Sequence, residues 1–490
     1  MRYVGWSEYH HDAGFGIIEE NGDISFATQS ERYSKVKNDN YIHPELGKMV
    51  RDDDILCFFE RAALQEERIQ VKDRKTGKLV PFKYNFAPSG MQISPTEALC
   101  IEHHHSHAAL AFCTRPWNSK DDTVILTVDG VGESTSSGIF NSNFDHIKRV
   151  PFPKSIGIIY SHTTNYLGLK PLEDEYIVMG MAAYGKNRIS DKLTDFYNNH
   201  TQNPRFAGEK VNVFNDQGLH RLLDYYTMNE HYPPNDIAAS VQAFAEQEIF
   251  NLAKEARKYG SKLVYAGGVA QNVVANTKIR SLFDEVWIPP CPTDGGSGLG
   301  AAAYFYCKDN NTDKINWQHP YLGHEMPEVN PREVVEYLLE NKYCGVASGR
   351  AEFGPRALGN RSLIADVRYD VKDTVNTIKR RQKFRPFAPA ILEEFAEDYF
   401  DGPMNEYMQY VAKAKHDYQS VIHVDGTSRV QIVKKDNPSV IRQILEEYYE
   451  KTGVPMLLNT SLNIRGKPIV NDKYDAYQFE VDNKTKVFYK

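Results

Sequence analysis

The chain has 490 residues, more than one hydrophobic core normally organises, and this length predicts two or three domains. Hydrophobic residues make up 41% of the chain and charged residues 25%, which is typical of a globular protein and excludes a disordered one. The 65 acidic side chains outnumber the 58 lysines and arginines, giving a net charge of −7. Broad binding of polyanions is therefore disfavoured, although a local basic patch is not.

The six cysteines are scattered and form no Cys-x-x-Cys pair, which indicates reduced thiols. The first residues, MRYVGWSEYHHD, are too polar for a secretory signal, and no apolar run approaches the length that spans a bilayer. We therefore expect a cytoplasmic protein without membrane association.

Predicted strands and helices alternate along the chain. Residues 2–28 predict a hairpin that turns at Asn21-Gly22-Asp23, and residues 60–83 predict a charged helix followed by a basic hairpin. We interpret the hairpin tip at 74–78 as a solvated turn; the alternative is a contact with a phosphate-bearing acceptor. Apolar strands, glycine turns and helical spacing follow over residues 124–130, 236–258, 262–272 and 286–306. This alternation predicts α/β layers.

The segment CIEHHHSHAALAF, residues 100–112, places four histidines at the start of an apolar helix. His103 and His107 are four residues apart, so they share one helix face and could hold one metal ion. A metal site needs a further ligand from elsewhere. Asp129 ends a buried strand and Asp294 precedes an alanine-rich helix, so each can supply a carboxylate. These four residues predict a mixed nitrogen and oxygen metal site for iron(II), zinc or manganese.

Two glycine-rich turns suggest a nucleotide site. Gly267 and Gly268 follow a strand in AGGVAQN, where a bare backbone lets a nucleotide lie close to it. Glycines also lie beside the two aspartates. Any single glycine pair is weak support, because tight strand-to-helix turns use glycine as well.

The region 345–470 is rich in arginine, and proline or glycine punctuates it. It follows a polar stretch, 308–327, that predicts a linker. Arginines held in rigid turns beside amide and hydroxyl side chains suit a small dianion that is bound bidentately. The alternative interpretations are surface salt bridges and nucleic-acid binding.

Taken together, the motifs resemble the O-carbamoyltransferase family that includes the nodulation-factor and aminoglycoside-antibiotic carbamoyltransferases. The resemblance spans nearly the whole chain, through HHDAG, SERYSKVKND, EHHHSHAALAF, VDGVGE, EYIVMGMAAYG, YAGGVAQN, GRAEFGPRALGNRS, KFRPFAPAIL, HVDGTSRVQ and LLNTSLNIRGKPIV. It implies an α/β fold with two domains: residues 1–325 of the actin/hsp70/sugar-kinase type, and residues 326–490, a YrdC-like domain that forms carbamoyl-adenylate.

The resemblance also implies roles for individual residues. Carbamoyl phosphate would bind among Arg356, Asn360, Arg361, Lys379, Arg385, Asn459 and Ser461. ATP, with magnesium, would give carbamoyl-adenylate, whose nucleotide would lie on Gly130, Gly132, Gly267, Gly268, Asn272 and Gly295. A metal on His103, His107, Asp129 and Asp294 would polarise it, with iron(II) the first expectation and manganese or zinc the alternatives. His11 would be the base, and Lys37 would lie near the phosphates.

The predicted function is ATP-dependent transfer of a carbamoyl group from carbamoyl phosphate to a hydroxyl. The acceptor is a sugar or antibiotic alcohol, or the hydroxymethyl group of a modified pyrimidine in a nucleotide or DNA. The alternatives are a tRNA threonylcarbamoyladenosine-type enzyme and a nucleotide-binding regulatory module. A homodimer is compatible with the sequence but is not indicated by any motif.

Overall fold

The computed structural model describes residues 1–68, 70–72, 79–81, 89–199, 205–206, 209–210 and 232–490. Contacts divide the chain into two compact units. Unit 1 contains residues 1–118, 289–423 and 428–490, and unit 2 contains residues 119–288 and 424–427. The predicted boundary between residues 325 and 326 is a division along the chain, and it stays a prediction. The predicted basic hairpin tip at 74–78 lies outside the described residues.

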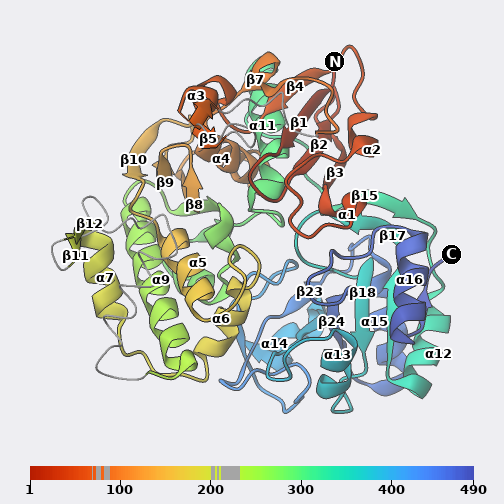
Figure 1. Cartoon of the computed structure of the whole chain (residues 1–490). Helices are drawn as coiled ribbons and strands as arrows, with labels where there is room; N and C mark the ends of the chain where they lie inside the picture. Colours follow the sequence, from red (N-terminus) through yellow and green to blue (C-terminus); the bar gives the residue numbers. More distant parts are fainter. Residues whose placement is uncertain (69, 73–78, 82–88, 200–204, 207–208, 211–231) are drawn as a thin grey trace. The chain divides into compact units, whose positions relative to one another are not determined.

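The N-terminal part of unit 1 is a mixed five-stranded sheet with the order β3-β2-β1-β4-β7 (Figure 1). Strands β1, β2 and β3 pair antiparallel, whereas β4 and β7 run parallel to β1. The predicted hairpin is confirmed, with its turn at Gly22, whose φ of 89° suits glycine. The elements are β1 (Tyr3–Ser7), β2 (Gly14–Ile18), β3 (Ile24–Gln29), α1 (Glu31–Ser34), α2 (Pro44–Gly47), β4 (Ile55–Phe58), α3 (Ala62–Arg68), β5 (Gln70–Lys72), β6 (Leu79–Pro81), β7 (Leu99–Cys100), α4 (His103–Cys113) and α11 (Asp294–Asp309).

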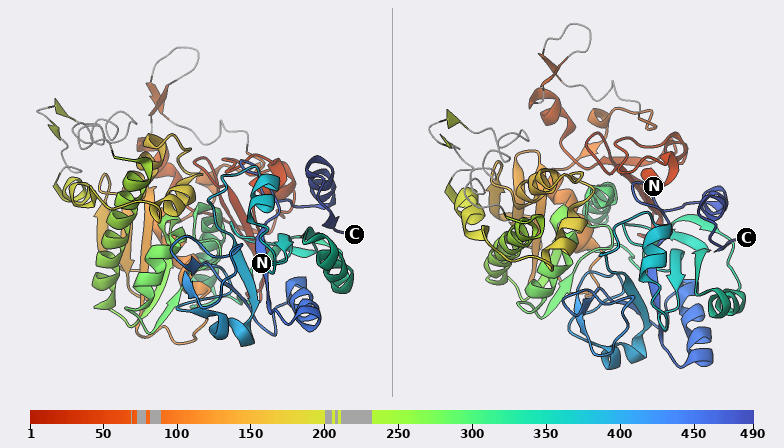
Figure 2. Two further views of the ribbon diagram at one scale, coloured as in Figure 1. Left: turned by 90° about the horizontal axis from the view of Figure 1, so that it is seen from below. Right: turned by 60° about the horizontal axis from the view of Figure 1, so that its bottom comes forward.

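Unit 2 repeats this plan. Its sheet has the order β10-β9-β8-β13-β14, again with three antiparallel strands followed by two parallel ones. Helix α9 packs on β8, and α5, α6 and α7 pack on α9 (Figure 2). The elements are β8 (Thr123–Gly132), β9 (Thr135–Phe140), β10 (His146–Pro151), α5 (Ile156–Tyr166), α6 (Glu175–Ala182), α7 (Ser190–Asn199), β11 (Arg205–Phe206), β12 (Glu209–Lys210), α9 (Pro234–Arg257), β13 (Lys262–Ala266), α10 (Val273–Arg280) and β14 (Glu285–Trp287).

The C-terminal part of unit 1 is built on a six-stranded sheet with the order β23-β19-β24-β18-β16-β25. Its central strands are antiparallel, and each outermost strand pairs parallel with its neighbour. The elements are β15 (Tyr321–Met326), α12 (Pro331–Asn341), β16 (Tyr343–Ala347), β17 (Gly349–Glu352), β18 (Arg361–Ala365), α13 (Lys372–Ile378), β19 (Ala388–Leu392), α14 (Ala396–Tyr399), β20 (Phe400–Asp401), β21 (Ala412–Ala414), β23 (Gln431–Val433), α15 (Val440–Thr452), β24 (Met456–Ser461), α16 (Lys473–Asn483) and β25 (Val487–Phe488).

The prediction of α/β layers is confirmed, because helices pack against each of the three large sheets. In unit 2 the core includes Val124, Leu126 and Val128 of β8 with Val241 and Phe244 of α9. Strand residues alternate between the two faces of a sheet, and a run without polar residues therefore marks burial on both faces. None of the helices in the described part of the chain combines the length and apolarity needed to cross a bilayer.

Candidate metal and carbamoyl-transfer site

Glycines of α11 allow this helix to approach both α4 and the sheet of unit 1. A Cβ added at Gly300 would lie 2.0 Å from the backbone oxygen of Ser106 on α4. On the sheet side of α11, a Cβ at Gly298 would lie 2.6 Å from the Cα of Trp6 on β1. Only hydrogen fits at these positions, so the glycines permit close backbone packing. The first turn of α11, which begins with Asp294, is thereby held against the first turn of α4.

Two histidines and one aspartate converge where these helix starts meet. The Nε2 atoms of His103 and His107 are 3.2 Å apart, and Oδ1 of Asp294 lies 3.4 Å and 3.1 Å from them, respectively. All three side chains are buried. A triangle with these edges is what three ligands make when each is about 2.0–2.2 Å from one cation. Two imidazoles and a carboxylate suit divalent iron, zinc or manganese, so the residues present fit a metal of this class.

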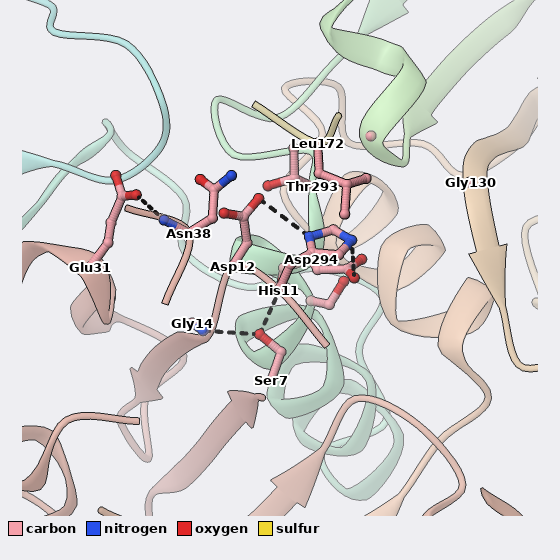
Figure 3. Close-up of polar contacts among 12 residues, drawn as sticks. Ser7, His11, Asp12, Gly14, Glu31, Asn38, Gly130, Leu172, Thr293 and Asp294 are labelled. Atoms are coloured by element: carbon pink, nitrogen blue, oxygen red, sulfur yellow. Dashed lines mark hydrogen bonds and ion pairs between the residues drawn. The ribbon is translucent and has the colours of Figure 1, made fainter. Parts of the chain in front are cut away.

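The ring of His107 and the backbone of Asp294 are each fixed by a serine. Oγ of Ser297 lies 3.2 Å from Nδ1 of His107, which leaves Nε2 to face the carboxylate. The hydroxyl of Ser7 donates to the backbone oxygen of Asp294 at 2.6 Å and accepts from the N–H of Gly14 at 3.0 Å (Figure 3). The sequence did not single out either serine.

The ring of His11 lies beside this cluster, between two carboxylates (Figure 3). Its Nε2 is 3.7 Å from Oδ2 of Asp294, and its Nδ1 is 3.7 Å from Oδ2 of Asp12. The side chain of His11 is 31% exposed. A base must lie within reach of the proton that it accepts, and the predicted role of His11 as the base stays a prediction.

Lys37 is held in an ion pair. Its Nζ lies 2.7 Å and 2.9 Å from the carboxylate oxygens of Glu31, which is buried and also accepts from the N–H of Asn38 at 2.9 Å. The lysine side chain is 31% exposed. Its predicted contact with phosphates stays a prediction.

Asp129 and most of the predicted nucleotide glycines belong to unit 2. Oδ1 of Asp129 accepts from the N–H of Gly130 at 2.8 Å and from the N–H of Gly268 at 3.1 Å. These bonds orient the carboxylate at the end of β8. Gly267 has φ of 101°, and a Cβ there would lie 2.2 Å from the oxygen of Val128, so this position requires glycine. Asp129 stays a predicted fourth ligand.

The remaining predicted nucleotide residues have structural contacts of their own. Asn272 caps α10 by accepting from the N–H of Ala275 at 3.1 Å, and its amide pairs with Gln242 at 3.0 Å and 3.1 Å. Gly132 ends β8. Gly295, in unit 1, lies against β2, since a Cβ at Gly14 would lie 2.0 Å from its backbone oxygen. A Cβ at Gly295 itself would lie 2.9 Å from Nε2 of Gln29, and the predicted nucleotide contact of Gly295 stays a prediction.

A second cluster, of cations, lies in the C-terminal part of unit 1. Lys379 is buried, and its Nζ donates to the oxygens of Ser461 and to the side-chain oxygen of Asn463 at 2.9 Å. Burial lowers the pKa of Lys379 well below its usual range, and the charges of Arg381 and Arg385 lower it further. Three predicted residues, Lys379, Arg385 and Ser461, are thus brought together.

Arg429 belongs to the same cluster. Burial lowers the pKa of its guanidinium well below the usual range, and the charges of Arg356, Arg381 and Arg385 act in the same direction. Neighbouring positive charges repel one another, and a bound anion would stabilise them. Arg429 lies in HVDGTSRVQ, so the signal was present in the sequence, but the sequence interpretation did not select it as a ligand.

Three other predicted residues of this group are occupied by the fold. The guanidinium of Arg361 is fully buried and donates to the backbone oxygens of Ser348, Gly349, Asn360, His324 and Asn471 at 2.8–3.2 Å. The amide of Asn360 bridges Ser439 and Arg350, and that of Asn459 donates to Ala357 and Gln431. Arg361 therefore cross-links the backbone, and its predicted contact with carbamoyl phosphate stays a prediction.

Comparisons with known proteins assign the chain to a family. The family model "Carbamoyltransferase N-terminus" matches residues 90–303, and "Carbamoyltransferase C-terminus" matches residues 335–489. Nodulation protein NolO of Bradyrhizobium diazoefficiens is 31% identical over 422 residues, covering 77% of this chain and 75% of that protein. Nodulation protein U of Sinorhizobium fredii is 29% identical and covers 93% of each chain.

The chain belongs to the carbamoyltransferase family. This carbamoyltransferase is an enzyme of O-carbamoyl transfer, as the sequence predicted. The family assignment does not favour the alternative of a tRNA threonylcarbamoyladenosine-type enzyme.

Similarity to solved structures is weaker. The carbamoyltransferase aligns with the activator of 2-hydroxyisocaproyl-CoA dehydratase from Clostridium difficile at a TM-score of 0.37 and 13% identity, covering 65% of this chain and 100% of that one. It aligns with HypF from T. kodakarensis at a TM-score of 0.32 and 13% identity, covering 63% and 48%. Likeness at this level does not assign a fold.

Proposed function

We propose that this carbamoyltransferase uses carbamoyl phosphate and ATP, and that carbamoyl-adenylate carries the carbamoyl group to an acceptor hydroxyl. The observation that carries the proposal is a set of neighbouring cations in which burial lowers the pKa of both Lys379 and Arg429, and the charges of Arg381 and Arg385 lower both further. Such a set suits a small phosphorylated donor better than a neutral amino acid or bicarbonate.

In this proposal the donor lies among Arg356, Lys379, Arg385, Arg429 and Ser461. The arginines bind its phosphate, and Lys379, already placed on Ser461, adds a fourth cation. Arg361, Asn360 and Asn459 would border this site, and their polar groups also hold the surrounding backbone. Water releases phosphate from the donor and leaves carbamate, which attacks the α-phosphorus of ATP and displaces pyrophosphate.

The two domains would carry out different steps: the C-terminal domain would form carbamoyl-adenylate, and the N-terminal domain would transfer the carbamoyl group. We propose an actin/hsp70/sugar-kinase-type N-terminal domain, residues 1–325, and a YrdC-like C-terminal domain, residues 326–490. Support for the first comes from the two five-stranded sheets, which share one strand order and one pattern of strand directions. The nucleotide, with magnesium when ATP is bound, would lie on Gly130, Gly132, Gly267 and Gly268, beside Asn272.

His103, His107 and Asp294, with Asp129 as the predicted fourth ligand, would hold a divalent metal, with iron(II) the first candidate and manganese or zinc the alternatives. When bound, this ion would act as a Lewis acid toward the carbamoyl group. Ser297 would keep His107 oriented for that role, because a metal-bound imidazole is fixed by the partner of its other ring nitrogen.

His11 would accept the proton of the acceptor hydroxyl as the oxygen bonds to the carbamoyl carbon, and AMP would leave. Histidine suits this step because its pKa lies near neutrality. When the adenylate is bound, Lys37 would leave its ion pair with Glu31, and its positive charge would then offset the negative charge of the phosphate. The acceptor would be an alcohol of a sugar or antibiotic, or a hydroxymethylpyrimidine in a nucleotide or DNA, in the cytoplasm.

The test follows each half of the reaction separately. Labelled carbamoyl phosphate and ATP are supplied without acceptor, and phosphate, AMP and pyrophosphate are measured. An acceptor panel of aminoglycosides, lipo-oligosaccharides and hydroxymethylated DNA is then added, and products are identified by mass spectrometry. Release of ADP in place of AMP, or AMP formation that does not require carbamoyl phosphate, would contradict the proposal.

A further inference from the structure

The backbone around His11 has an unfavourable conformation. Tyr9 has φ of 84° and Asp12 has φ of 53°, so two non-glycine residues flanking the histidine pair lie in the left-handed region. Such residues keep this conformation only where their surroundings hold it, and they cluster at functional sites. On one side the loop is held by backbone hydrogen bonds from Tyr9 to Asn40 at 2.6 Å and from Ala13 to Asp39 at 2.8 Å.

On the other side the loop is held through His10. Its Nε2 lies 3.0 Å from Oε1 of Glu60, and the second oxygen of that carboxylate accepts from Nε2 of Gln65 at 3.0 Å. Glu60 is buried, with 1% of its surface exposed. A buried carboxylate is costly unless its oxygens are satisfied, so this one is held tightly in place by its partners.

Burial alone would lower the pKa of His10, but the hydrogen bond and the charge of Glu60, together with the charge of Asp294, outweigh it and raise this pKa above its ordinary value. Below that pKa the contact is a charge-assisted hydrogen bond between an imidazolium and a carboxylate.

The same short stretch also contacts the metal-ligand candidates. Phe59, next to Glu60, has its ring 6.4 Å from that of His10 and 5.4 Å from that of His103, measured between ring centroids. Residues 59–60, which directly follow β4, therefore touch both the neighbour of the base and one imidazole of the cluster. This stretch therefore connects the loop that carries His11 with the ring of His103.

We propose that Glu60 and His10 are positioning residues for carbamoyl transfer. Their hydrogen bond holds the strained loop 9–12 so that the imidazole of His11 stays beside Asp294. Neither residue touches the reacting atoms. The inference rests on the proposed role of His11 as the base. It adds that this role requires the hydrogen bond between His10 and Glu60.

The test compares Glu60→Ala, Glu60→Gln and His10→Phe with the unchanged chain in the two half-reactions. We expect Glu60→Ala and His10→Phe to slow carbamoyl transfer about tenfold or more, since small misplacements of a reacting group have large effects. AMP formation from ATP and carbamoyl phosphate should stay unchanged in both. Glu60→Gln keeps an oxygen that accepts from His10, and it should restore most of the transfer rate.

The matched control is Glu394→Ala, which removes the ion pair with Arg442 on the C-terminal part of unit 1. It should lower the melting temperature, and any change in rate should be the same for AMP formation and for carbamoyl transfer. Transfer at the normal rate in both Glu60→Ala and His10→Phe would overturn the proposal, and so would an equal loss in both half-reactions. If Glu60→Ala does not fold, His10→Phe decides alone. Failure of the unchanged chain to form AMP would instead refute the proposed function.

Discussion

Oδ1 of Asp294 lies 3.1 Å from Nε2 of His107, although 187 positions separate the two residues in the chain. Asp294 begins α11, and His107 follows the first turn of α4. The glycines of α11 bring these two turns together. Three buried acceptor-rich side chains meet there. We propose that a divalent cation is bound among them.

Removing a ligand should therefore remove the metal. We expect Asp294→Ala and His107→Ala to lower the bound divalent metal about tenfold or more relative to the unchanged chain, because three protein ligands become two. Elemental analysis after gel filtration measures the metal content. Carbamoyl transfer should be lost while AMP formation continues. His319→Ala, which removes a histidine in the segment before β15, is the control. Full metal content in both ligand variants would contradict the assignment.

The cation cluster should be required for hydrolysis of carbamoyl phosphate. We expect Arg429→Ala and Arg356→Ala each to reduce phosphate release from carbamoyl phosphate about tenfold or more, since hydrogen bonds to a charged group contribute about 1.5–3 kcal/mol. Arg332→Ala, which removes an exposed arginine on α12, should leave the rate unchanged. The rates are measured with a phosphate assay at fixed ionic strength. An undiminished rate in both cluster variants would remove these arginines from the donor site.

The close packing of α11 predicts that replacing one of its glycines by alanine destabilises the protein, which is the opposite of the usual effect in a helix. An alanine in a helix interior is normally about 1 kcal/mol more favourable than a glycine. At Gly300 the new Cβ would lie 2.0 Å from the oxygen of Ser106, so Gly300→Ala should destabilise the protein by about 1–3 kcal/mol instead. Urea unfolding followed by circular dichroism measures this. A stabilised variant would show that α4 and α11 are not in close contact.

The ion pair of His10 and Glu60 predicts a dependence of stability on pH. Because the pKa of His10 is raised in the folded chain, its contribution is fully present below the pKa of an unfolded histidine and is lost as pH rises through the folded value. Glu60→Gln should therefore lower the melting temperature more at pH 5.5 than at pH 8.5, where about all histidine is neutral. Thermal unfolding at both pH values provides the measurement. An equal loss at the two values would argue against a charged pair.

The sequence by itself determined much of this protein. Helical spacing placed His103 and His107 on one face, and α4 confirms it, because a periodic pattern is set by local geometry. The hairpin at Gly22, the α/β layers and the family are likewise confirmed, since each rests on local turn chemistry, periodicity or ordered motifs.

Only the tertiary structure decided which polar groups remain available. Arg361 lies in GRAEFGPRALGNRS and Arg429 in HVDGTSRVQ, and neither motif tells that the first holds five backbone oxygens while the second faces other arginines. The contacts of His10 with Glu60 and of His107 with Ser297 join residues from distant segments. A side chain's free hydrogen-bonding capacity depends on neighbours that the chain brings in from elsewhere, and local sequence does not contain that information.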